Sequence, residues 1–104
     1  MVGRVWSATA TANGADAYRF HFEESVLPSL GAVDGYRGAY LLRREHTETT
    51  ELQVMTLWDS IEAITAFAGS DIDKAVVEPE AQAVLKTYDR EVRHYDVIVN
   101  TVNR

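Results

Sequence analysis

A strand-to-helix junction with a tryptophan at its seam lies in the middle of the chain, in the segment Leu57–Phe67 (LWDSIEAITAF). The residues Thr50–Trp58 are rich in β-branched and apolar types, as is typical of a strand. Asp59 or Ser60 suits the N-cap of the helix that follows, and Asp59 and Glu62 have the spacing of a capping box. Such a junction favours a fold in which strands and helices share one core, so we expect an α+β protein.

Hydrophobic periodicity predicts further strands and helices on both sides of this junction. The expected strands are Val2–Thr11, Tyr36–Glu45, Thr50–Trp58 and Asp89–Val102. The expected helices are Ala15–Leu30, which Pro28 kinks or ends, Ser60–Gly69 and Pro79–Tyr88. A short helical turn is expected at Asp71–Glu78, and turns are expected at Asn13-Gly14 and Asp34-Gly35. The order β-α-β-β-α-β is that of the ferredoxin-like split motif, with a four-stranded antiparallel sheet. At 104 residues, the chain is expected to form a single domain over residues 1–104.

Both faces of the predicted sheet carry apolar side chains, although two helices can cover only one of them. The apolar residues on the two faces include Leu41, Met55, Val97 and Val99. The simplest cover for the second face is another copy of the chain, so we expect a closed twofold homodimer. The end of the last strand, from Val97 to Val102, would offer its edge amides to the partner.

Composition excludes several classes of partner. Sixteen acidic residues against ten basic ones give a net charge of −6, which argues against nucleic-acid binding. The absence of cysteine excludes disulfides and thiol chemistry, and no spacing of histidines resembles a metal site. No apolar run approaches the roughly 20 residues that cross a bilayer, so we expect a cytoplasmic protein without a membrane partner.

The order of elements, the Trp58-Asp59-Ser60 seam and the terminal strand His94-Tyr95-Asp96-Val97 resemble the antibiotic biosynthesis monooxygenase family of dimeric α+β barrels. The resemblance covers nearly the whole chain. It implies a cavity between the helices and the sheet of each protomer. Some members of the family oxidise phenolic substrates with molecular oxygen and without metal or flavin, so the resemblance implies no cofactor here. Other members degrade haem.

Two branches of the family can be compared with the chain position by position. The quinone-forming oxygenases share the seam tryptophan, but Val54, Ile64 and Glu78 stand where that branch has Asn, Tyr and Arg. The haem-degrading branch has a Trp on the second helix and a His iron ligand beyond it, where this chain has Phe67 and Val77. The resemblance therefore favours a cofactor-independent oxygenase over haem degradation.

Titratable residues supply candidates for the chemistry. His94 shares a strand face with Asp96, and a histidine there could act as a general base or serve only as a structural hydrogen-bonding group. His21 lies on the first helix and points to the cavity rim or to solvent. Arg43 is the expected catalytic partner for an anionic substrate, with Arg4 as the alternative.

Large aromatic side chains are the expected walls of the cavity, although core filling is the more common use for any one of them. They are Trp6, Tyr18, Phe22, Tyr40, Trp58 and Phe67. We therefore expect a base-assisted reaction of a small aromatic or polyketide-type substrate with oxygen in an apolar cavity. The alternatives are a lyase, isomerase or cyclase on the same scaffold, and a non-catalytic dimer that binds a small apolar ligand.

Overall fold

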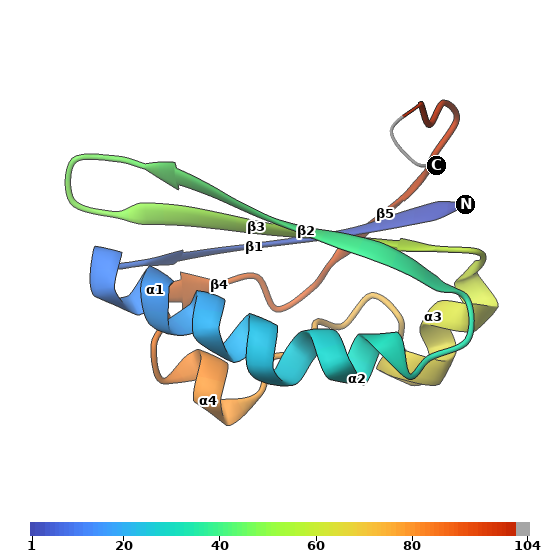
Figure 1. The fold of residues 1–104 in the computed structure, drawn as a ribbon, viewed down its shortest axis with the longest axis horizontal. Coiled ribbons are helices and arrows are strands. Elements are labelled where there is room, and N and C mark those ends of the chain that lie inside the picture. The colour runs from blue at the N-terminus through green and yellow to red at the C-terminus, as the bar shows by residue number, and fades with distance from the viewer. Residues whose placement is uncertain (102–104) are drawn as a thin grey trace.

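The chain folds into an antiparallel five-stranded sheet with its helices on one side (Figure 1). This computed structural model describes residues 1–101. The elements are β1 (Val2–Ala10), α1 (Ala12–His21), the π-helical turn η1 (Phe22–Val26), α2 (Leu27–Gly31), β2 (Tyr36–Glu45), β3 (Thr50–Trp58), α3 (Ile61–Ala68), α4 (Pro79–Gln82), β4 (Thr87–Tyr88) and β5 (Arg93–Asp96). The predicted ferredoxin-like α+β order is confirmed.

The sheet has β1 in its interior and β2 at one edge. The strand order is β2-β3-β1, and both β4 and β5 pair with the free side of β1. Thr9 lies opposite Thr87 of β4, and Arg4 lies opposite His94 of β5. The single last strand predicted from the sequence is therefore two short strands that share one neighbour.

The C-terminal third of the sequence prediction is wrong in three places. The helix predicted for Pro79–Tyr88 ends at Gln82, because the Lys86 amide already donates to the Thr9 carbonyl at 2.7 Å. The segment Asp71–Glu78 is irregular instead of helical. The last strand does not span Asp89–Val102: β5 covers only Arg93–Asp96, which pair with Val5–Val2 of β1.

Two side chains after β5 are largely exposed, Ile98 at 90% and Val99 at 74%. The amide of Val97 still donates to the Met1 carbonyl at 3.0 Å, and the pairing with the sheet stops there. Position 102, the predicted end of the strand, lies outside the described residues.

The long first helix is continuous from α1 to α2 through the π turn η1. It begins at Ala12, earlier than predicted, because the Thr11 hydroxyl accepts from the Gly14 amide at 2.9 Å and caps it. Asn13-Gly14 is thus part of the helix, and the lack of a side chain at Gly14 allows close approach of the Val84 carbonyl. The π turn ends two residues before Pro28. It accommodates the kink predicted at Pro28 without ending the helix.

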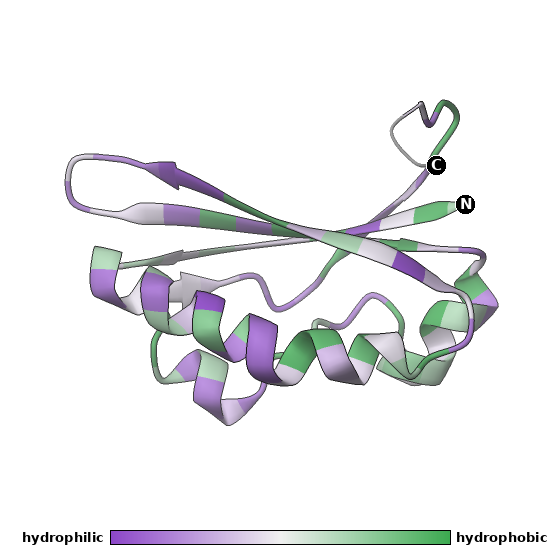
Figure 2. Cartoon of the chain, in the orientation of Figure 1, coloured by the Kyte–Doolittle hydropathy of each residue, from purple (hydrophilic) through white to green (hydrophobic). Residues whose placement is uncertain are grey.

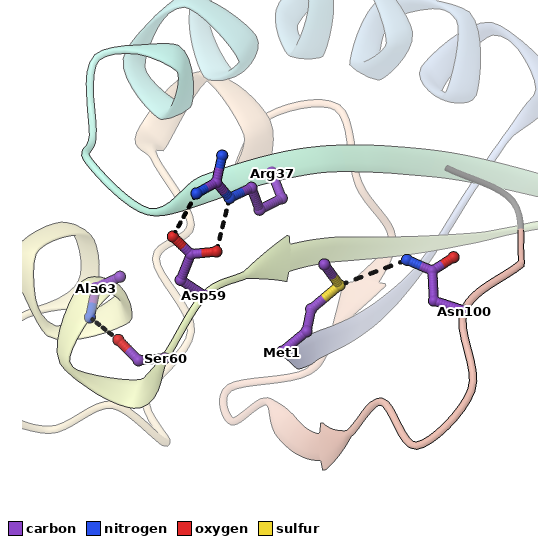
Figure 3. A network of polar contacts seen from close by, with 6 residues as sticks. All are labelled: Met1, Arg37, Asp59, Ser60, Ala63 and Asn100. Atoms are coloured by element: carbon purple, nitrogen blue, oxygen red, sulfur yellow. Dashed lines mark hydrogen bonds and ion pairs between the residues drawn. The ribbon is translucent and has the colours of Figure 1, made fainter. Parts of the chain in front are cut away.

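Two side chains, the carboxylate of Asp59 and the hydroxyl of Ser60, hold the seam after β3 (Figure 3). Ser60 caps α3, because its hydroxyl accepts from the Ala63 amide at 3.2 Å. Asp59 does not form the predicted capping box; its carboxylate accepts two hydrogen bonds from Arg37, at 2.6 and 2.7 Å. This pair ties the start of β2 to the end of β3.

The core lies between the helices and the sheet, and the opposite face of the sheet has no helix over it (Figure 1). Apolar and polar residues alternate along the strands, as the bands of Figure 2 show. We call the uncovered side the open face; its apolar members include Tyr40, Leu42 and Tyr95, which are 42%, 47% and 53% exposed. Within the described part of the chain, no helix has the length and apolarity needed to cross a membrane.

Candidate functional site

A cavity of about 70 Å³ lies between the helical layer and the sheet. Its walls come from β1, β3, α1, η1, α3 and the irregular segment that precedes α4. Five of the residues predicted to bind substrate line it: Trp6, Tyr18, His21, Phe22 and Phe67. These five are a minority of the lining residues, but they include every aromatic ring of the wall.

The aromatic side chains of the wall pack on one another. The ring of Tyr18 lies 5.8 Å from that of Trp6 and 6.2 Å from that of Phe22, measured between centroids. Burial, with a smaller contribution from the charge of Glu78, raises the pKa of the Tyr18 phenol. Tyr18 is therefore a neutral hydroxyl at physiological pH and is not a base.

Two of the predicted aromatic residues do not line this cavity. Trp58 is completely buried behind Phe67, with 5.8 Å between the ring centroids, and its indole donates to the Thr56 hydroxyl at 2.7 Å. It supports the wall without forming it. Tyr40 lies on the open face of the sheet, away from the cavity.

Arg4 is the arginine of the cavity, and it is only 5% exposed. Its Nη1 donates to the Ile72 carbonyl at 2.6 Å and lies 3.0 Å from Nε2 of His94, while Nη2 donates to the Lys74 carbonyl at 3.1 Å. Burial lowers the pKa of Arg4, and the charge of Asp73 opposes this shift. Because guanidinium stays protonated in proteins, Arg4 places a positive charge at the cavity.

Arg43, the predicted catalytic arginine, lies elsewhere. It belongs to the edge strand β2, where its Nη1 donates to the Asp16 carboxylate at 2.7 Å and its Nε lies 3.5 Å from Glu45. It lines a separate groove beneath α1, together with Arg19 and Glu23. Its charge is thus already paired at the surface, whereas that of Arg4 is not.

His94, the predicted base, contacts Arg4 instead of the cavity. Its side chain is 11% exposed, and its Nδ1 lies 3.6 Å from the Asp73 carboxylate. Burial and the charge of Arg4 lower the pKa of His94, and Asp73 opposes them. The imidazole is therefore neutral near pH 7, with Nε2 free to accept from Arg4. This arrangement makes His94 a support for Arg4, and its carboxylate neighbour is Asp73, not the predicted Asp96.

His21 is the histidine that lines the cavity. Its Nε2 lies 3.2 Å from Oε1 of Glu78, and its side chain is 12% exposed. The ring centroid lies 6.1 Å from that of Tyr18. Gln82 donates to the Val77 carbonyl at 2.9 Å and holds the backbone next to Glu78 in place. A histidine paired with a carboxylate can accept a proton and share the resulting charge.

Sequence reasoning committed to Arg43, although a signal for Arg4 was present. Arg4 lies on the same face of β1 as Val2, Trp6 and Ala8, because every second residue of a strand points to the same side. It is therefore a charged residue on the apolar face of the strand. Such a residue is rare unless the fold uses its charge. Within residues 1–101, no cluster of three or more His, Asp or Glu side chains could hold a metal ion.

Comparisons with known proteins agree with the fold. The family model described as antibiotic biosynthesis monooxygenase matches residues 1–90. None of the curated proteins compared with the chain matches it.

Solved structures share the fold at low sequence identity. MhuD from Mycobacterium tuberculosis, described as a haem degrader with two haems bound in its active site, has a TM-score of 0.64 and 20% identity, covering 97% of this chain and 99% of that one. A MhuD variant with two manganese protoporphyrin IX molecules per active site has a TM-score of 0.69 and 20% identity, with coverage of 99% and 100%. SnoaB from Streptomyces nogalater, described as a cofactor-independent oxygenase, has a TM-score of 0.62 and 10% identity, with coverage of 98% for both chains. On the match over residues 1–90, the chain belongs to the antibiotic biosynthesis monooxygenase family.

Proposed function

We propose that the protein is a cofactor-independent oxygenase that acts on a small phenolic aromatic substrate in the cavity beneath the sheet. One observation carries the proposal: a single apolar cavity is lined both by a buried arginine, Arg4, and by a histidine paired with a carboxylate, His21 with Glu78. The likeness of the fold to SnoaB, a cofactor-independent oxygenase, supports the same class of reaction.

In the proposed mechanism, His21 takes the proton of the substrate hydroxyl, and the charge of Glu78 stabilises the imidazolium that forms. The electron-rich phenolate then reduces oxygen, and a C–O bond forms at the ring carbon para to the hydroxyl. Negative charge moves from the phenolate to the new peroxide, where the guanidinium of Arg4 stabilises it. Loss of the ring proton and cleavage of the O–O bond give a quinone and one water.

The cavity volume limits how the substrate enters. About 70 Å³ is less than a bicyclic phenol requires, so part of the wall must move. The irregular segment Asp71–Glu78 is the element that we propose moves, because it has no helix or sheet ladder of its own and Val76 within it is 50% exposed. Its carbonyls at Ile72 and Lys74 accept hydrogen bonds from Arg4, so the movement is proposed for the part around Val76.

Haem degradation, the activity stated for MhuD, has weaker support. A haem would require a much larger displacement of the cavity wall than a bicyclic phenol would. The chain also has Phe67 and Val77 where the haem-degrading branch has its Trp and its His ligand. We therefore propose a phenolic ligand and not a haem.

We also propose that residues 1–104 form one domain and act as a homodimer. The open face of the sheet exposes Tyr40, Leu42 and Tyr95, and the last segment exposes Ile98 and Val99. A second copy of the chain would remove these side chains from water, which favours association.

Oxygen uptake with 1,5-dihydroxynaphthalene tests the proposed reaction. We expect one O₂ to be consumed and one water released for each 5-hydroxy-1,4-naphthoquinone formed. His21→Gln should lower kcat by about 10²- to 10⁴-fold, because it removes the base, with the melting temperature little changed. His46→Gln is the matched control, since His46 lies in the exposed hairpin loop and should leave kcat unchanged. Substrate conversion without oxygen uptake would instead indicate a lyase, isomerase or cyclase. Binding without conversion would indicate a ligand-binding protein.

A further inference from the structure

We infer that the ligand of the cavity is an aryl carboxylate, whose permanent negative charge pairs with Arg4 while its hydroxyl lies at the His21 end. The inference rests on the proposed function only in taking this cavity as the ligand site. It adds the class of substrate, which neither the fold nor the family specifies.

The first argument is the number of donors left on Arg4. A guanidinium has five N–H hydrogens. Three of them point to acceptors within the described residues: the carbonyls of Ile72 and Lys74, and Nε2 of His94. The Nε–H and one hydrogen of Nη2 have no acceptor among these residues. Neighbouring N–H groups of this kind are the pair that a carboxylate accepts in bidentate geometry.

The second argument is the charge around Arg4. All three acceptors of its hydrogen bonds are neutral, and Arg4 is only 5% exposed. The carboxylate whose charge acts on it is Asp73, which lies behind His94 and has a side chain that is 72% exposed. A buried cation without a close anionic partner is unfavourable, so a ligand carboxylate would supply the missing partner.

The third argument is the division of the cavity into two polar ends. Glu78 also lines the cavity, but its carboxylate pairs with His21, with 3.2 Å between Oε1 and Nε2, and makes no ion pair with Arg4 among the described residues. The Glu78 carboxylate is thus already engaged at the His21 end. Trp6 and Phe67 supply aromatic wall to the same cavity, and the guanidinium carbon of Arg4 lies 6.0 Å from the ring centroid of Phe67. A flat aromatic ligand matches this polarity when it has its hydroxyl at the His21 end and a carboxylate that reaches Arg4 from a position other than the carbon para to the hydroxyl, which stays free to react with oxygen.

Calorimetric titration with 3-hydroxybenzoate and 3-hydroxybenzamide, in the absence of oxygen, tests the inference. The two probes have nearly the same shape and differ in charge. We expect the protein to bind the acid at least about 10-fold more tightly than the amide. The net charge of −6 repels anions in general, so such a preference requires a specific site.

Three variants assign the preference to one residue. Arg4→Met should abolish it while keeping the affinity for the amide, and Arg43→Met is the matched control, because Arg43 is already paired with Asp16 and should leave the preference intact. If Arg4→Met does not fold, Arg4→Lys, which keeps the charge and loses the planar fork, should weaken the preference. In the wild type, the NMR signal of the Arg4 Nε–H should shift with the acid and not with the amide.

Equal affinities, absence of binding by either probe, or an unmoved Nε–H signal would overturn the inference. The outcome is separable from that of the proposed reaction. A protein that prefers the acid but never consumes oxygen would contradict only the oxygenase proposal. A protein that oxidises 1,5-dihydroxynaphthalene but binds the amide as well as the acid would contradict only the carboxylate inference.

Discussion

Replacing Trp58 by alanine is expected to lower the free energy of unfolding by about 3–5 kcal/mol. Trp58 is completely buried, and it packs edge-on against Tyr36, with the ring centroids 5.6 Å apart, and against Phe67 at 5.8 Å. The substitution leaves a void at the strand-to-helix seam and removes the indole donor of the Thr56 hydroxyl. Urea denaturation followed by far-UV circular dichroism measures the change without depending on tryptophan fluorescence.

Phe20→Ala is the matched control for Trp58→Ala. It also removes a large aromatic ring, but Phe20 is 67% exposed on α1, so the free energy of unfolding should change by no more than about 0.5 kcal/mol. A loss below about 1 kcal/mol for Trp58→Ala would mean that the seam tryptophan does not hold the sheet and α3 together.

Leu42→Asp is expected to convert a homodimer into monomers. Leu42 is 47% exposed on the open face, where it follows Tyr40 on the same side of the edge strand β2, and a second copy would bury it. An unpaired carboxylate buried in such an interface is strongly unfavourable. Sedimentation equilibrium should give twice the 11.6 kDa chain mass for the wild type and the single chain mass for the variant.

Phe20→Asp serves as the control for the dimer, because it places the same charge on an exposed aromatic position of the helical side. It should leave the mass of the wild-type dimer unchanged. A wild-type protein that sediments as a monomer at micromolar concentration would contradict the twofold assembly, and so would a Leu42→Asp variant that remains dimeric.

Local sequence signals were sufficient to predict a structural element where its own residues determine its bounds. The strand before Trp58 alternates buried and half-buried positions, and Ser60 caps the helix that follows, so this junction could be predicted from the sequence. The last strand could not be predicted in the same way. Its residues pair with Val2–Val5 of β1, which lie almost a hundred residues away in the sequence, and the local pattern of residues does not encode this pairing.

The two arginines show why the site was only partly predictable. Arg4 and Arg43 each lie in a strand on the side that faces the helices. They differ in strand order: β1 has neighbours on both sides, whereas β2 is an edge, so only Arg4 is deeply buried. Periodicity gives the face of a strand but not its place in the sheet.

The histidines show the same limit. His94 was predicted from the carboxylate two residues away, but its actual neighbours are Arg4 and Asp73, which come from distant parts of the chain. His21 pairs with Glu78, which lies 57 residues further along the chain (78 − 21). No local pattern encodes either contact, because both depend on how the irregular segment before α4 crosses the helical layer.

An NMR titration of ¹⁵N-labelled protein with 1,5-dihydroxynaphthalene, without oxygen, tests most directly whether the ligand enters the cavity beneath the sheet. The account predicts shifts for the Trp6 indole N–H, which donates to the Asp89 carbonyl at 2.8 Å, and for the amides of Ala75–Val77, with the amides of Tyr40 and Leu42 unmoved. Shifts confined to Tyr40 and Leu42, or no shifts at all, would contradict it.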